Sequence, residues 1–130
     1  MENLSLDLSK KLHELDVVVE TNANWYKSGG MITGHLCLKM DEVCEHDVYV
    51  CPAPTFEELW AVMPDEITDS DNDCYYLNME KVHRKLDVTR CMYANEIIDH
   101  IIEQFSHESP TEAAGMLLVW LAENGHLEGK

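Results

Sequence analysis

Lysine and arginine are absent from a long stretch in the middle of this 130-residue sequence. Between Asp41 and Glu80 there are twelve acidic residues and no basic one, and the whole chain has a formal net charge of −16. Such a surface repels the phosphates of DNA and RNA, so we do not expect direct nucleic-acid binding. The pattern suits attraction to a basic protein or imitation of nucleic acid, and also a solvated surface that keeps a small protein soluble.

Long hydrophobic runs are also missing. The longest uninterrupted apolar run, Ala113–Ala122, has ten residues, whereas a membrane-spanning helix needs about twenty. The first residues are amphipathic and mixed in charge, which is unlike a secretion signal. Five cysteines without tight spacing indicate reduced thiols rather than a disulfide framework. We therefore predict a cytoplasmic protein without a membrane partner.

Sequence signatures of catalysis are absent as well. We find no nucleophile elbow, HExxH motif, phosphate-binding glycine loop or dinucleotide fingerprint. The segment Lys27–Gly30 has the composition of a phosphate cradle, but Gly29-Gly30 between two strands is more simply a hairpin turn. We predict a protein that is not an enzyme, with no catalytic residue, cofactor or resident metal. Five aromatic residues suggest either a ligand pocket or ordinary core packing: Trp25, Tyr26, Trp60, Tyr75 and Tyr76.

Two segments have the hydrophobic periodicity of helices. Near the start, apolar residues recur at helical spacing, at Leu4, Leu8, Leu12 and Leu15. Residues 95–105 place five apolar side chains on one helical face, namely Ile97, Ile98, Ile101, Ile102 and Phe105. We predict a helix at each of these places.

Two further helices are marked by their end signals. Thr55 and Glu58 have the spacing of a capping box, and Pro64 ends the helix whose buried face we predict to be Phe56, Leu59, Trp60 and Met63. Ser109 is the predicted N-cap of the last helix, with Pro110 in its first turn and Glu112 closing a second capping box. Gly125 is its predicted stop. Apolar residues on nearly every side of that helix predict burial against a sheet and a neighbouring helix, with a dimer surface as the alternative.

The strands follow from β-branched and aromatic runs between turn residues. We predict a hairpin of Val17–Asn22 and Met31–Leu38, a third strand over residues 46–52, and a second hairpin over Cys74–Tyr93. That second hairpin turns near His83-Arg84, with a helix over Met79–Leu86 as the alternative, and the acidic residues 65–73 form a loop. The sum is a single α+β domain, residues 1–130, in which three or four helices pack an antiparallel sheet of about four or five strands.

Two groups of side chains raise the question of a metal. Asp69, Asp71, Asp73 and Glu80 have the spacing of calcium ligands in an EF-hand loop. However, Cys74 occupies the position that requires glycine, and Pro64 ends the preceding helix too early. A solvated acidic loop is therefore our interpretation, and the spacing alone does not decide between the two.

The second metal question concerns zinc. If residues 35–46 form a hairpin that turns at Met40-Asp41, their alternate side chains share one face. Two imidazoles and two thiolates would then meet and suit tetrahedral zinc, from His35, Cys37, Cys44 and His46. Structural zinc sites usually take a ligand pair from a tight knuckle, which is lacking here. Buried cysteines beside exposed histidines are the alternative that we prefer.

Three segments together resemble a family of small uncharacterised proteins encoded by phages and prophages of gut bacteria. They are LSKKLHEL at residues 8–15, CPAPTFEELWAVMPDEI at 51–67 and SPTEAAGMLLVWLAENGHL at 109–127. The family shows LSKxLxELG, APTxxELxxxLP and EAxxxMLxWLxENG in the same order. Asp16 departs from this pattern, because the family often has glycine there. The resemblance implies a phage-derived protein in a bacterial cytoplasm and implies no activity.

These observations favour a phage or prophage accessory protein that binds a host or phage protein with a basic surface. A more specific alternative is an acidic inhibitor that imitates nucleic acid before a host defence or DNA-handling enzyme. A small-ligand or metal-binding protein is the other alternative. A homodimer is compatible with the sequence.

Overall fold

The computed structural model describes residues 3–21, 23–28, 35–39, 48–82 and 88–127. These residues form three helices and seven strands, in an α+β arrangement with two antiparallel sheets. The helices are α1 (Leu6–Glu14), α2 (Phe56–Val62) and α3 (Pro110–Glu123). The strands are β1 (Asn24–Ser28), β2 (His35–Lys39), β3 (Val48–Pro52), β4 (Glu66–Thr68), β5 (Cys74–Lys81), β6 (Thr89–Asn95) and β7 (His100–His107).

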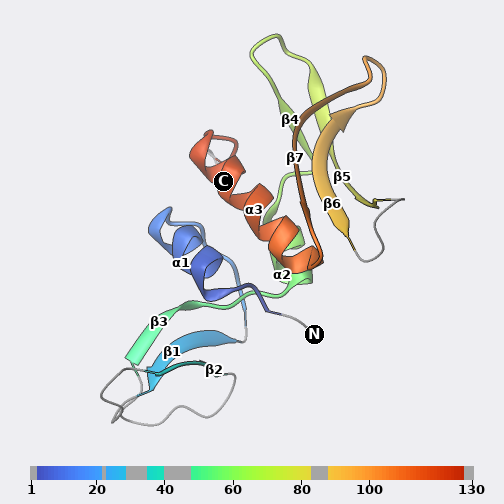
Figure 1. Cartoon of the computed structure of the whole chain (residues 1–130). Coiled ribbons are helices and arrows are strands. Elements are labelled where there is room, and N and C mark those ends of the chain that lie inside the picture. The colour runs from blue at the N-terminus through green and yellow to red at the C-terminus, as the bar shows by residue number, and fades with distance from the viewer. Residues whose placement is uncertain (1–2, 22, 29–34, 40–47, 83–87, 128–130) are drawn as a thin grey trace.

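The helices lie between the two sheets (Figure 1). The larger sheet has the strand order β4-β5-β6-β7, and the smaller one has the order β2-β1-β3. Helix α3 packs on β6, β7, α1 and α2, while α1 also contacts β3. This confirms the predicted α+β class, in which helices pack an antiparallel sheet of four strands. All strands were predicted to lie in one sheet, whereas three of the described strands form a second, smaller sheet.

Helix α3 forms the centre of the core, as its composition predicted. Leu117, Leu118 and Leu121 are fully buried, together with Leu59 of α2 and Leu4 before α1. Ser109 accepts the N–H of Glu112 at one end. At the other end, Gly125 has a φ of 74° and a Schellman pair of bonds closes the helix. No described helix is long and apolar enough to cross a membrane.

One prediction about the caps is wrong in detail. The Glu112 carboxylate accepts the N–H of Ser5 at 2.7 Å, while the N–H of Ser109 donates to Nδ1 of His107. Glu112 therefore connects the starts of two helices instead of closing a capping box. The capping box of Thr55 and Glu58 is confirmed, with both reciprocal bonds present.

The helix predicted from the isoleucines of residues 95–105 is wrong. Residues 96–99 form a turn, and the chain continues as β7, paired with β6 from Asn95↔His100 to Thr89↔His107. The side chain of Asn95 accepts the N–H groups of Ile97 and Ile98, which turns the backbone where a helix would have continued. Isoleucine is also common in strands because it is β-branched, so the helical spacing of these isoleucines did not decide between helix and strand.

The first predicted hairpin lies further along the chain than expected. Residues 17–21 belong to no strand, and β1 begins at Asn24 instead. The N–H of Val17 is taken by Leu12 at the end of α1, and the hydroxyl of Thr21 donates to Glu58 at 2.8 Å. This extended segment therefore packs on the core without a strand partner. The predicted turn at Gly29-Gly30 lies outside the described residues, but β1 and β2 do pair antiparallel.

The remaining strand predictions are largely confirmed. Strand β3 ends at Pro52, and β5 and β6 form the second hairpin, whose predicted turn at His83-Arg84 lies outside the described residues. The alternative helix over Met79–Leu86 is wrong at its start, because Met79 belongs to β5. The acidic loop of residues 65–73 is shorter than predicted, since Ile67 is buried at the centre of the short strand β4.

Candidate functional site

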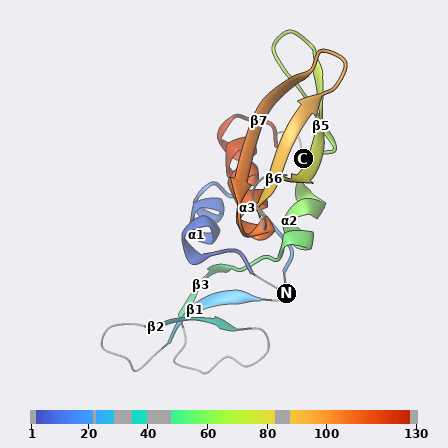
Figure 2. The ribbon, with the colours of Figure 1, turned by 45° about the vertical axis from the view of Figure 1, so that its right-hand side comes forward.

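Two hairpin connections meet at one end of the four-strand sheet. Residues 69–73 join β4 to β5, and residues 96–99 join β6 to β7. The Asn95 side chain donates to the carbonyl of Cys74 at 2.9 Å, and the rings of Tyr75 and His100 contact edge-on with centroids 5.9 Å apart. The two connections therefore lie side by side, at the end of the sheet farthest from the smaller sheet (Figure 2).

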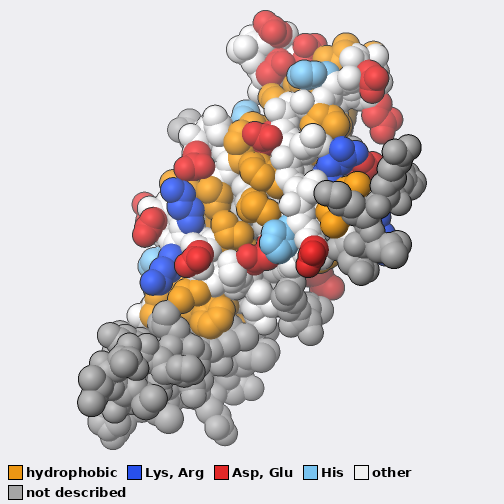
Figure 3. All heavy atoms as spheres, viewed as in Figure 1, with side chains coloured by type: hydrophobic (Ala, Val, Ile, Leu, Met, Phe, Trp, Pro, Cys, Tyr) orange, Lys and Arg blue, Asp and Glu red, His pale blue; other side chains and the backbone are white. Residues whose placement is uncertain are grey.

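We call these two connections the acidic tip. It contains five carboxylates and no lysine or arginine, with Asp69, Asp71, Asp73, Glu96 and Asp99 as its acidic residues. Acidic side chains gather at this end of the molecule in Figure 3, where hydrophobic side chains lie among them. The tip therefore combines negative charge with exposed apolar surface.

Asp69 organises the first connection. Its Oδ1 accepts the N–H groups of Asp71 and Asp73, both at 2.9 Å, and its Oδ2 accepts the hydroxyl of Tyr75 at 3.1 Å. The N–H of Asp73 is the main cause that lowers the pKa of the Asp69 carboxyl. Asn72 adopts a φ of 66°, a conformation that asparagine tolerates well. The ionised carboxylate of Asp69 thus stabilises the turn through these hydrogen bonds.

The structure brings three of the four predicted calcium ligands together. Ligand oxygens of Asp69, Asp71 and Asp73 lie within 4.8 Å of one another. Glu80 is elsewhere, near the other end of β5, where it forms an ion pair with Arg90. Without that fourth side chain, the loop lacks the EF-hand ligand arrangement.

Two of the four predicted zinc ligands fall outside the described residues. His35 and Cys37 belong to β2, where their backbones pair with Ser28 and Tyr26 of β1. Cys44 and His46 lie outside the described residues, so the four-ligand hairpin stays a prediction.

Two isoleucines of the second connection are exposed. Ile97 has 95% of its surface exposed and Ile98 has 49%, although the sequence pattern placed both in a buried helix face. The acceptor bonds of Asn95 hold their backbone in the turn. The signal that reveals this turn is Asn95 itself, because asparagine often bonds to the backbone two residues ahead.

The outer face of the four-strand sheet extends this apolar surface. Tyr76, Ala94 and Ile101 stand in one row across the sheet, and Tyr76 and Ile101 are 53% and 36% exposed. The described helix that contacts this sheet, α3, packs on β6 and β7 on the side of the buried residues Cys91 and Tyr93. The row therefore lies on the uncovered side, continuous with the acidic tip.

The five aromatic residues do not form one pocket. The Trp25 indole donates to the carbonyl of Leu4, and Tyr26 contacts Tyr49 across β1 and β3. Trp60 stacks on Phe56 within α2, with centroids 5.2 Å apart. Tyr75 and Tyr76 belong to the other sheet, on opposite faces of β5. Ordinary core and cross-strand packing accounts for these contacts, so the described residues support the packing alternative and not a shared ligand pocket.

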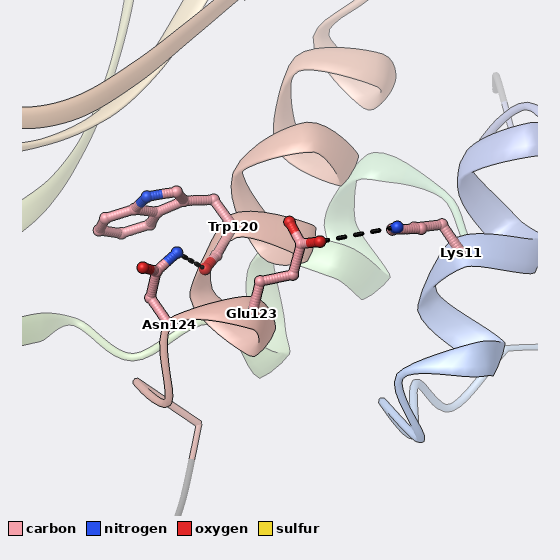
Figure 4. Close-up of polar contacts among 4 residues, drawn as sticks. All are labelled: Lys11, Trp120, Glu123 and Asn124. Atoms are coloured by element: carbon pink, nitrogen blue, oxygen red, sulfur yellow. Dashed lines mark hydrogen bonds and ion pairs between the residues drawn. The ribbon is translucent and has the colours of Figure 1, made fainter.

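An open groove of about 640 Å³ lies between the ends of α1, α2 and α3. Its lining is mainly aliphatic, with Leu15, Val17, Val18, Ala61, Val62, Ala122 and Leu127, and Asp16 contributes its one carboxylate. An ion pair of Lys11 and Glu123, 3.6 Å apart, joins α1 to the end of α3 (Figure 4). This lining provides no set of catalytic groups.

The thiols of Cys51 and Cys91 are poor candidates for nucleophiles. Cys51 and Cys91 are fully buried, and burial raises the pKa of the Cys91 thiol to about 11. A thiol of that pKa is protonated at neutral pH and unreactive.

Comparison with models of known protein families, with curated proteins and with solved structures finds no match for this chain. The surface chemistry of the molecule therefore provides the basis for a functional proposal.

Proposed function

We propose that this protein is a non-enzymatic binding module of phage or prophage origin, which acts in the bacterial cytoplasm on a protein with a basic surface. The acidic tip is the proposed contact site. One observation carries the proposal, which is that exposed isoleucines lie among carboxylates at one end of the molecule. Protein interfaces commonly combine an apolar centre with a polar, charged rim.

The two components of the tip would act at different stages of binding. The carboxylates attract a basic partner over distances of about 10 Å at 0.1 M salt and favour a correct first encounter. Ile97 and Ile98 lose their exposed apolar surface only on close contact, at about 25 cal/mol for each Å². Affinity would thus depend on the isoleucines, and the rate of association on the charges.

The acidic inhibitor is a narrower form of the same proposal. In that form the basic surface is the nucleic-acid site of a host defence or DNA-handling enzyme. What supports it is the run from Asp41 to Glu80 without a basic residue, of which Asp69, Asp71 and Asp73 lie within the acidic tip.

Capture from bacterial host lysate tests the proposal. The immobilised wild-type protein is compared with Ile97→Asp/Ile98→Asp and with Val18→Asp as the matched control. Val18 is 83% exposed and lies on a different surface, in the apolar groove. We expect a partner that is retained by wild type and Val18→Asp at 0.05 M NaCl, is lost with the double variant, and is released at 0.5 M NaCl.

Equal capture by the double variant, or retention that does not depend on salt, would contradict the proposed site. For a captured partner, an excess of double-stranded DNA distinguishes the two forms of the proposal. Displacement of the partner by DNA supports the inhibitor, and coexistence of all three components supports a binding module that leaves nucleic acid in place.

A further inference from the structure

Strand β7 has a free hydrogen-bonding edge. It is the last strand of the order β4-β5-β6-β7, so among the described residues it pairs with β6 alone. The N–H of Val82 donates to the carbonyl of Val88 at 3.0 Å. Because opposed residues of antiparallel strands alternate between hydrogen-bonded and non-hydrogen-bonded pairs, this bond shows which residues of β6 bond to β5. The backbone groups of Arg90 and Met92 accordingly point to β5. The residues opposite them on β7 are Ser106 and Gln104, whose backbone N–H and C=O groups therefore point away from the sheet.

A carboxylate occupies the centre of this edge. The outward N–H of Gln104 donates to Oε1 of Glu103 at 2.9 Å, at an exposed position. A carbonyl of an added strand would take that place, because adding a strand to an edge requires its outward N–H groups. In the free protein, Glu103 thus accepts the outward N–H of Gln104, but no further strand or helix of the described residues covers the edge.

The inner side of the edge offers apolar surface to such a strand. Ile102 and Phe105 of β7 and Trp120 of α3 are only partly buried against the core, and α3 packs along β7. In a strand, alternate side chains point to the same face. Alternate apolar residues of an added strand would therefore lie against the half-covered residues Phe105 and Trp120.

The charge around the edge selects the partner. From Cys91 to Gly129 the sequence has no lysine or arginine but seven acidic residues, which include Glu103. A second copy of the chain would bring the same charge and a net charge of −16, and like charges across an interface oppose association. A basic segment would instead be attracted to these acidic residues, and the Glu103 carboxylate would leave the Gln104 N–H as the strand is added.

From this geometry we infer that β7 accepts an extended, basic segment of the partner protein as a fifth strand of the sheet. The segment alternates apolar residues, which face Phe105 and Trp120, with basic residues. The inference rests on the proposed function, since it specifies how the basic partner is held beside the acidic tip.

A synthetic probe tests the edge directly on the full chain. The probe is an eight-residue peptide of alternating lysine and valine, followed by fluorescence anisotropy and by amide NMR of the protein. Two matched peptides serve as controls, one N-methylated at every residue so that neither of its edges can donate to a strand, and one with glutamate in place of lysine. We expect binding of the lysine peptide at least tenfold tighter than of either control, with shifts at Gln104 and Ser106.

Protein variants complete the test. Gln104→Pro removes the outward N–H and leaves the ladder with β6 intact, whereas Gln104→Ala retains the N–H. We expect at least tenfold weaker peptide binding for Gln104→Pro and less than a threefold change for Gln104→Ala, with both variants folded by circular dichroism. Equal binding of the N-methylated peptide, no binding of the lysine peptide, or no effect of Gln104→Pro would overturn strand addition.

The same variants separate this inference from the proposed function. If lysate capture depends on Ile97 and Ile98 but is unchanged in Gln104→Pro, the binding module stands and strand addition is wrong. If the peptide adds to β7 while capture from lysate is unchanged by substitution of Ile97 and Ile98, strand addition is supported and the acidic tip is not the contact site. Dimerisation of the wild type that Gln104→Pro abolishes would identify a second copy as the occupant and overturn the basic partner.

Discussion

The carboxylate of Glu112 accepts a hydrogen bond from the backbone N–H of Ser5, 107 residues earlier in the chain. The bond is 2.7 Å long and joins the start of α1 to the first turn of α3. A carboxylate in the first turn of a helix is also favoured by the helix dipole. Glu112 is thus one of the few polar links between the first and last helices.

We expect Glu112→Ala to lower the free energy of unfolding by about 2 kcal/mol, because it leaves the Ser5 N–H without its charged partner. The matched control is Glu123→Ala in the same helix. Glu123 pairs with Lys11 at 3.6 Å, and both side chains are about half exposed, so its loss should cost under about 1 kcal/mol. Urea denaturation measures both, and equal losses would mean that the Ser5 bond contributes nothing special.

Gly115 lies directly against Leu4. A Cβ atom at Gly115 would come within 2.4 Å of Cδ1 of Leu4, in a part of the core that is fully buried. We expect Gly115→Leu to destabilise the protein by about 2 kcal/mol through overpacking. Met116→Leu, next in the helix and half-buried, is the control that should change stability by less than about 1 kcal/mol. Thermal unfolding compares them, and unchanged stability of Gly115→Leu would show that the Leu4 contact is loose.

Asp16 adopts a φ of 58° just after α1, where Val17 and Asp16 donate to Leu12 and His13 as in a Schellman motif. Glycine is the residue that this conformation favours. Asp16→Gly should therefore stabilise the protein by about 1 kcal/mol. Glu14→Gly, two residues earlier within α1, should instead destabilise it by about 1 kcal/mol. A gain for both, or a loss for both, in urea denaturation would contradict this account.

The charge of Asp69 makes part of the stability depend on pH. Its folded-state pKa lies below the ordinary value of 3.8, so its stabilisation is complete above that value and is lost as the pH falls through the lower folded pKa. Asp69→Asn should lower stability at pH 7 and flatten the fall in stability between pH 4 and 2. Parallel acid profiles for wild type and Asp69→Asn would refute the role of this charge.

Calcium should leave the protein unchanged. Glu80, the fourth ligand that an EF-hand loop requires, is paired with Arg90 near the other end of β5. We expect no rise in melting temperature when 1 mM CaCl2 replaces 1 mM EDTA, because a bound ligand stabilises only when its concentration exceeds its Kd. A rise of several degrees that Asp71→Asn removes would reveal a calcium site at the acidic tip.

Local signals in the sequence were sufficient for the elements with marked ends. The caps at Thr55, Ser109 and Gly125 each bond as their residue types predict, so α2 and α3 are read correctly from the sequence. The isoleucines after Asn95 were not, because their spacing fits a helix and their branching fits a strand. These residues form a strand because they pair with β6, and the periodicity of a local segment carries no information about such a partner.

The candidate site was predictable only in part. The acidic run from Asp41 to Glu80 indicated a charged surface, but its meeting with Ile97 and Ile98 depends on two hairpins that end side by side. The edge of β7 was hidden for the same reason, since the strand itself had been assigned to a helix. Because residues 95–105 were predicted to form a helix, both the apolar part of the site and the open edge of β7 were missed.

The contact of Leu4 with Gly115 also has a consequence for synthesis on the ribosome. The first helix emerges from the exit tunnel long before the helix on which it packs has been translated. Until Gly115 and Glu112 appear, Leu4 and Leu12 have no core to enter, and α1 alone is too short to be stable in water. The nascent chain must therefore keep these leucines from other contacts for more than a hundred residues of elongation. Domain closure is then a late event, because it requires the residues of α3.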